Sequence, residues 1–124
     1  MALYEFSVSV STRYLSQQSD PAASRYVFSY TVTVKNIGSM KAQLIARHWI
    51  IKDANGNEEE VRGLGVIGYQ PLLEPGQEFE YTSGTALETP LGSMLGSYLC
   101  VAEDGAQFNA AIPEFVLSLP RTLH

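Results

Sequence analysis

Apolar and polar residues alternate with a period of two along most of this chain. In YEFSVSVS, residues 4–11, every second side chain is apolar. In FSYTVTVK, residues 28–35, aromatic and valine side chains alternate with serine, threonine and lysine. The run EFEYTS, residues 78–83, has the same pattern. Because successive side chains of a β-strand point to opposite faces, each run predicts a strand with one buried face and one solvent-facing face.

The segment 42–63 predicts a hairpin that turns at Asn55-Gly56. This dipeptide favours a two-residue turn, since both of its residues tolerate the positive φ that such a turn requires. A two-residue turn fixes the register, which would pair Ile50 with Val61 and Trp49 with Arg62.

A second hairpin is predicted over residues 95–112, with its turn at Asp104-Gly105. Beyond it the apolar positions change parity, from even numbers at 108–112 to odd numbers at 115–119. One extra residue near Pro113-Glu114 would explain the change, so the pattern predicts a β-bulge there.

The chain therefore contains about seven predicted strands and no helical segment of ten residues. This pattern favours an all-β fold, an antiparallel β-sandwich that is immunoglobulin-like or fibronectin type III-like. The 124 residues contain no linker or internal repeat, which predicts a single domain over residues 1–124. Edge strands of such a sandwich offer surfaces for a protein partner or for a homo-oligomer.

Composition narrows the classes of partner. The formal net charge is −5 and the eight lysine and arginine residues are scattered, so we expect no binding to nucleic acid. No apolar run approaches the roughly 20 residues that cross a bilayer, and the first residues do not resemble a secretory signal. We therefore expect no membrane insertion and a cytoplasmic location.

Gly63, Gly65 and Gly68 have the G-x-G-x-x-G spacing of a loop that wraps a pyrophosphate. Such a loop is followed by a helix whose free N–H groups face the phosphate, but Pro71 and Pro75 prevent a sustained helix here. We expect these glycines to serve a tight inter-strand crossing. Weak anion binding through a nest of backbone N–H groups is the alternative.

Arg47, Trp49 and Arg62 form a second candidate site. The hairpin register above would place Trp49 on the face opposite the core, beside both arginines, where it would be a partner-binding hot spot. The habit of immunoglobulin folds to bury a tryptophan on the third strand would instead place Trp49 in the core. Both interpretations stay open, and the buried position is preferred.

The remaining chemistry-bearing residues do not form a catalytic or metal-binding pattern. Cys100 lies in an apolar strand, which raises the pKa of a thiol rather than activating it. His48 and His124 are the only histidines, and the run Glu58–Glu60 is typical of a charged edge strand. We therefore expect no enzymatic activity, no catalytic residue, no metal site and no cofactor.

Several longer runs resemble the bacterial ApaG family. They are the Arg-His-Trp run at 47–49, the glycine loop with its Gln-Pro at 70–71, PGQEFEYTSG at 75–84 and ETPLGSM at 88–94. The resemblance covers nearly the whole chain, from about residue 5 to residue 124. It implies a fibronectin type III-like or immunoglobulin-like sandwich.

The resemblance also implies a link to cobalt resistance and magnesium efflux, without agreed catalytic residues. Domains similar to this family in larger eukaryotic proteins look like binding modules. The function expected from the sequence is therefore a protein-binding module that acts through a partner. The alternative is a small-ligand sensor that binds pyrophosphate-containing nucleotides or divalent cations at the glycine loop.

Overall fold

The structure is a computed structural model, and it describes residues 2–120. It contains eight strands and two short 3₁₀ helices, in the order β1 (Phe6–Tyr14), η1 (Ser16–Gln18), η2 (Pro21–Ala23), β2 (Tyr26–Asn36), β3 (Ala42–Asp53), β4 (Glu58–Leu64), β5 (Leu72–Leu73), β6 (Glu78–Leu87), β7 (Leu91–Ala102) and β8 (Gln107–Ser118).

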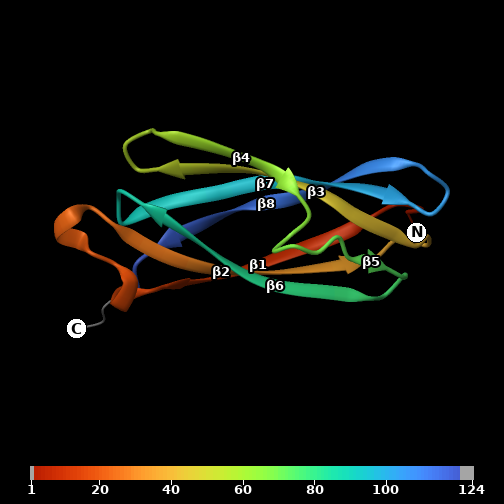
Figure 1. Cartoon of the computed structure of the whole chain (residues 1–124), viewed down its shortest axis with the longest axis horizontal. Coiled ribbons are helices and arrows are strands. Elements are labelled where there is room, and N and C mark those ends of the chain that lie inside the picture. Colours follow the sequence, from red (N-terminus) through yellow and green to blue (C-terminus); the bar gives the residue numbers. More distant parts are fainter. Residues whose placement is uncertain (1, 121–124) are drawn as a thin grey trace.

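The strands form two antiparallel sheets that pack face to face. One sheet has the order β1-β2-β6, and the other has the order β4-β3-β7-β8, with the short β5 paired to β3. Figure 1 looks onto the side where β4 and β6 are the nearer edge strands, while β1 and β8 lie behind them. Three strands facing four is the arrangement of a fibronectin type III domain, which confirms the predicted sandwich. The one strand beyond the predicted seven is β5.

The core lies between the sheets and is built from the alternating apolar positions. In β2 the even-numbered side chains from Phe28 to Val34 are all buried, as the sequence pattern predicts. The central contribution of the second sheet is Trp49, whose ring centroid lies 5.3 Å from that of Tyr30 and 5.9 Å from that of Phe115. Edge-to-face contacts of this kind stabilise aromatic cores beyond their area burial.

The register predicted for the β3–β4 hairpin is wrong by one residue. Lys52 pairs with Glu58 and Trp49 pairs with Val61, so three residues rather than two form the loop. Only Gly56 of this loop has a positive φ, 84°. The side chain of Asp53 accepts hydrogen bonds from the backbone N–H groups of residues 55 and 57 and thereby stabilises the longer loop.

Two bulges shift the alternation within strands. The register of β7 and β8 changes between Met94 and Gly96, opposite Pro113-Glu114, which confirms the bulge predicted there. A second register shift, which the sequence analysis missed, lies between Leu44 and Ala46 of β3. The extra residue, Ile45, moves the inward positions of β3 from even to odd numbers.

None of the helices among residues 2–120 has the length and apolar character needed to cross a membrane.

Alkaline pH is expected to destabilise the fold through buried acids in the core. Burial raises the pKa of the Cys100 thiol from 9.0 to about 12 and that of Tyr81 from 10.0 to about 12. The Tyr81 hydroxyl is hydrogen-bonded to that of Tyr98, whose pKa burial also raises. The folded state therefore retains protons that the unfolded chain releases at alkaline pH. The free energy of unfolding is at its full value below about pH 9 and falls as the pH rises toward 12.

Urea unfolding followed by circular dichroism at several pH values measures this loss. We expect a constant free energy of unfolding near neutrality and a decline that begins above about pH 9. The Cys100→Ala variant should begin to decline later, because tyrosines alone then titrate. A wild-type stability that stays flat up to about pH 11 would contradict the assignment.

Candidate functional site

The glycine loop is a tight turn between β4 and β5. Ile67 and Gly68 both have positive φ, 41° and 84°. The residues on either side, Val66 and Tyr69, donate to each other's carbonyl groups at 2.7 and 2.9 Å. Positive φ at both central positions is the signature of a type I′ turn. A β-branched residue rarely adopts such a φ, so Ile67 holds local backbone strain.

The backbone N–H groups of Gly65, Val66 and Tyr69 in this loop donate to carbonyl groups of the protein. Gly65 donates to Ile45, the extra residue of the β3 bulge, at 2.7 Å, and the Gln70 side chain donates to the same carbonyl at 3.0 Å. No helix follows Gly68, and residues 69–71 continue directly into β5. Ile67 and Gly68 at the tip of the turn donate to no backbone carbonyl of residues 2–120, but two amides without a following helix are not the row that wraps a pyrophosphate. The loop geometry therefore favours the structural interpretation of the glycines.

Gly63 has a separate role beside Arg47. A Cβ atom at Gly63 would lie 2.8 Å from Nη2 of Arg47, so the glycine provides space for the guanidinium group. Nη1 of Arg47 donates to the carbonyl groups of Leu64 and Gly65 at 2.9 and 3.0 Å. The arginine thereby ties the end of β4 to the interior side of β3.

Arg47, Trp49 and Arg62 do not form one exposed cluster. Trp49 is only 2% exposed, which agrees with the preferred interpretation and removes the premise of an exposed hot spot. Its cross-strand neighbour is Val61, and Arg62 pairs with His48. Together, the three-residue hairpin loop and the bulge at Ile45 place Arg62 and Trp49 on opposite faces of the sheet.

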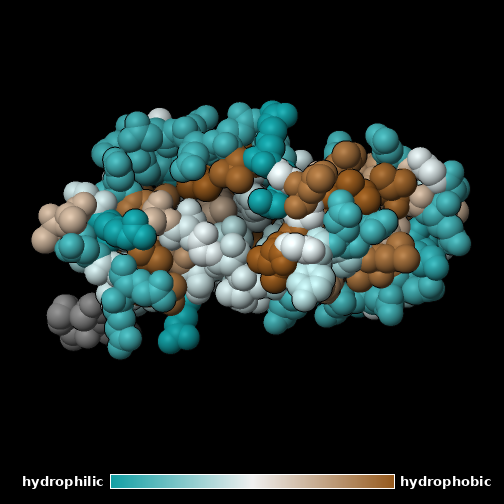
Figure 2. Space-filling model, in the orientation of Figure 1, coloured by the Kyte–Doolittle hydropathy of each residue, from teal (hydrophilic) through white to brown (hydrophobic). Residues whose placement is uncertain are grey.

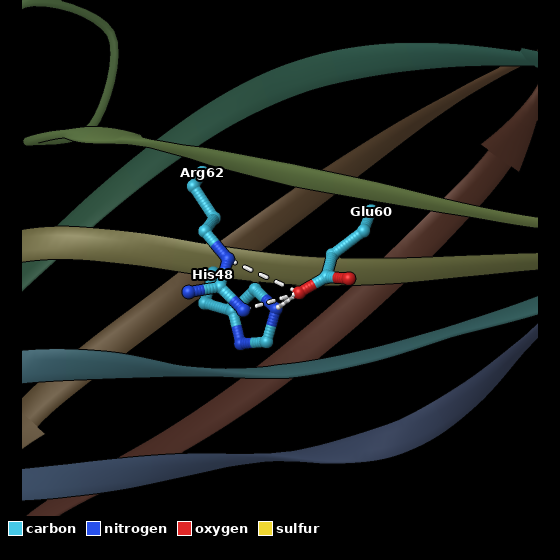
Figure 3. A network of polar contacts seen from close by, with 3 residues as sticks. All are labelled: His48, Glu60 and Arg62. Carbon is cyan, nitrogen blue, oxygen red and sulfur yellow. Dashed lines mark hydrogen bonds and ion pairs between the residues drawn. The ribbon is translucent and has the colours of Figure 1, made fainter.

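Arg62 belongs to a small polar network on the outer face of the β4-β3-β7-β8 sheet, shown in Figure 3. Oε1 of Glu60 lies 2.6 Å from Nε2 of His48, and it accepts hydrogen bonds from Arg62 Nη2 at 2.5 Å and Nε at 3.1 Å. The hydrogen bonds from Arg62, and to a smaller extent from His48, lower the pKa of the Glu60 carboxyl group. All three side chains remain substantially exposed, so this network contributes little to stability.

The other candidates from the sequence remain separate from one another. Cys100 is buried in the hydrophobic core, and its thiol donates a weak hydrogen bond to the carbonyl of Tyr98. Within residues 2–120, no group of three histidine, cysteine, aspartate or glutamate side chains has the geometry of a metal site. His124 lies outside the described residues.

An exposed apolar surface follows the glycine loop, and the sequence analysis did not single it out. Leu64 is 74% exposed and Tyr69 is 60% exposed, and both are large hydrophobic side chains. Ile67 and Leu72 are more than half exposed as well. Figure 2 shows hydrophobic side chains over the β4–β5 connection and β5, next to the hydrophilic covering of β4. We call Leu64, Ile67, Tyr69 and Leu72 the 64–72 surface.

Comparison with known proteins identifies the family. The family model described as the ApaG domain matches residues 16–102, which is more than half of the chain. The chain belongs to the ApaG domain family. Protein ApaG of Nitrosospira multiformis is 62% identical over 121 residues, covering 98% of this chain and 95% of its own length. Protein ApaG of Ralstonia nicotianae is 55% identical over the full length of both chains.

Solved structures agree with this assignment. The crystal structure of the ApaA protein from Bordetella pertussis has a TM-score of 0.95 and 55% identity, and the alignment covers 98% of both chains. The range matched by the ApaG domain model contains the β3–β4 hairpin, the glycine loop and all of β6. Both the 64–72 surface and the edge of the sandwich beside it are therefore parts of the ApaG domain itself.

Proposed function

We propose that this ApaG domain is a non-catalytic module that binds a protein partner. Through that partner it affects cobalt resistance and magnesium efflux indirectly. The location expected from the sequence is the cytoplasm. The observation that carries the proposal is the 64–72 surface, which concentrates four large apolar side chains on one short connection. Contiguous apolar patches with polar rims are typical of protein–protein interaction sites.

The surface is also held in a defined shape. The reciprocal hydrogen bonds between Val66 and Tyr69, together with the two Arg47 contacts, fix the connection on both sides. The Tyr69 ring packs against Phe79, with their centroids 5.9 Å apart. Little backbone conformational entropy is therefore lost when a partner covers these side chains, and a connection with an ordered backbone binds more tightly than a mobile one.

An affinity capture from cells that contain the native gene tests the proposal. The variant Leu64→Ser/Tyr69→Ser removes apolar area at exposed positions, so its free energy of unfolding should stay within about 0.5 kcal/mol per site of the wild type. We expect the captured partner to be lost with this variant and kept with Val116→Ser, since Val116 is 58% exposed on the distant β8. Captures with and without added cobalt show whether the interaction responds to the metal.

Two results would contradict this function. One is a partner that binds the Leu64→Ser/Tyr69→Ser variant as well as the wild type. The other is sustained hydrolysis of a dinucleoside polyphosphate by the pure protein with added metal. Calorimetry with diadenosine tetraphosphate, ATP, Mg²⁺ and Co²⁺ completes the test, and we expect flat titrations because the amides of Gly65, Val66 and Tyr69 are already hydrogen-bonded and no helix follows the loop.

A further inference from the structure

A lateral groove runs between the free edges of β4 and β6. Its first part is a cavity of about 400 Å³ with Tyr30, Trp49 and Met94 at the bottom and Arg47, Val61 and Thr85 at the sides. The second part adjoins it and shares residues 51, 59 and 86 with the first. Figures 1 and 2 look onto this side of the sandwich. The inward positions Ser83 and Thr85 of β6 are small and polar, and they leave the space between the sheets open here.

Two nearly buried polar side chains line the first part of the groove without a partner. Tyr30 is 7% exposed and Trp49 is 2% exposed. Within residues 2–120, neither the Tyr30 hydroxyl nor Trp49 Nε1 makes a hydrogen bond, although every fully enclosed side-chain polar atom there has one. Both groups therefore face the open side of the cavity. Because these two donors make no hydrogen bond within the described part of the protein, a ligand with hydrogen-bond acceptors can take the place of water at them.

Arg47 adds a positive charge to the same cavity. Its recorded acceptors are two neutral carbonyl groups, and no carboxylate within the described residues forms a salt bridge with it. An arginine whose charge has no carboxylate partner, beside the indole and phenol donors, is suited to bind a carboxylate. Gly63 leaves the space that the guanidinium occupies at the edge of the cavity.

The second part of the groove has the opposite charge. Asp53, Glu58, Glu59 and Glu88 line it, and no lysine or arginine does. Glu59 lines the first part as well, where Arg47 is the one cation among the described lining residues, so the groove changes from mixed charge to acidic along β6, from the level of Ser83 to that of Glu88. A ligand that spans both parts must carry a negative group at one end and a positive group at the other.

The two edges that border the groove differ in their protection against strand pairing. The β4 edge carries charged side chains at Glu58–Glu60 and Arg62, which discourage a neighbouring strand. The β6 edge over residues 82–86 reads TSGTA and has neither a charge nor a proline. An unprotected edge beside an open groove is suited to the addition of an extended peptide strand.

We propose that this groove binds an extended peptide segment that adds to the free edge of β6. The segment places a carboxylate against Arg47, Tyr30 and Trp49, and it places a basic side chain in the acidic part. The distance along β6 from Ser83 to Glu88 corresponds to a separation of about four to six residues in the peptide, at about 3.3 Å per residue. The groove is distinct from the 64–72 surface, so the proposal for either site can be correct when the proposal for the other is wrong.

Trp49 is the only tryptophan of the chain, so its fluorescence reports binding at the groove. The probes are acetylated, amidated peptides of threonine and valine with one lysine and one glutamate about five positions apart, in both orders. We expect saturable quenching or enhancement with one order. Replacing the peptide's glutamate by glutamine should weaken binding about tenfold, since a charge-assisted hydrogen bond is lost. Calorimetry provides a second measurement on the same samples.

Two test variants, each with a matched control, show whether the peptide binds in the groove or elsewhere on the protein. Thr85→Phe fills the cavity and should abolish binding, whereas Thr82→Phe, on the outer face of the same strand, should not. Glu59→Lys/Glu88→Lys should weaken binding of the lysine-containing peptide and strengthen binding of a peptide with a second glutamate in place of the lysine. Glu103→Lys, on the distant β7–β8 turn, is the matched charge control.

Three results would overturn the proposal. The first is the absence of saturable binding by calorimetry for every mixed-charge peptide. The second is equal binding of free glutarate and the peptide, which would mark a site for small acids. The third is a dimer in sedimentation that the Thr85→Phe variant abolishes, which would show that a second copy of the chain occupies the groove.

Discussion

Replacing Trp49 by alanine is expected to lower the free energy of unfolding by about 3–5 kcal/mol. The ring is 2% exposed and contacts aromatic rings from both sheets, so its removal leaves a cavity at the centre of the sandwich. Tyr30 and Phe115 cannot collapse into this space without moving their own strands. The loss therefore combines the transfer energy of the indole with the cost of the cavity.

Urea unfolding followed by circular dichroism measures this change, because the variant has no tryptophan to report by fluorescence. Tyr69→Ala is a suitable control, since it removes a large aromatic side chain that is 60% exposed, and we expect its effect to stay within about 0.5 kcal/mol. The wild-type emission of Trp49 should be blue-shifted. A red-shifted emission, or a Trp49→Ala variant as stable as the control, would contradict the buried position.

The Gly96→Ala variant is expected to lose about 3 kcal/mol, at the upper end of the usual cost of overpacking. A Cβ atom at Gly96 would lie 2.0 Å from the carbonyl oxygen of His48 and 3.2 Å from Cα of Trp49. Both neighbours are backbone atoms of the central strand β3, so no side-chain rotation relieves the clash. The strands β3 and β7 would have to separate at the middle of the larger sheet.

Gly84→Ala provides the matched control on β6. Its Cβ atom would meet only the carbonyl oxygen of Phe28, at 3.4 Å, and Gly84 has no positive φ. We expect this variant to equal the wild type or to gain about 0.4–1 kcal/mol, because alanine restricts the unfolded chain. Thermal unfolding of the two variants side by side gives the comparison. Equal stability of Gly96→Ala and Gly84→Ala would mean that the close approach of β3 and β7 is wrong.

The strands themselves could be predicted because their alternation is local. In β2 the sequence pattern identifies each buried position from Phe28 to Val34. The bulge at Pro113-Glu114 was also predictable, since a change of parity within one strand leaves a trace in the sequence. Such features depend only on the two faces of a strand, which the sequence displays directly.

The register between neighbouring strands was harder to predict from the sequence. The Asn55-Gly56 dipeptide is compatible with loops of two or three residues, and the side chain of Asp53 decides for three by capping two backbone N–H groups. The bulge at Ile45 leaves no clear trace, because the positions on both sides of it are apolar. Each single-residue offset reverses which side chains face the core.

The candidate site was likewise predictable only where its features are local to one segment of the sequence. The prolines after Gly68 correctly indicated that no helix follows the glycine loop. The groove could not be predicted, since Tyr30, Arg47 and Thr85 come from three different strands and meet only after the sheets have packed. Its one local signal is the run TSGTA, an edge segment without charge or proline.

The bulge at Ile45 also bears on how the length of this chain can vary. A residue gained or lost there would exchange the inner and outer faces of the strand from Ala46 to Asp53, and it would displace the carbonyl that Gly65 and Gln70 share. The tip of the hairpin that follows is solvent-exposed and carries no such constraint. Insertions and deletions among relatives should therefore accumulate at the tip of the hairpin and avoid the bulge at Ile45. A hairpin exchanged between homologues should accordingly comprise residues 46–64, so that the bulge stays intact.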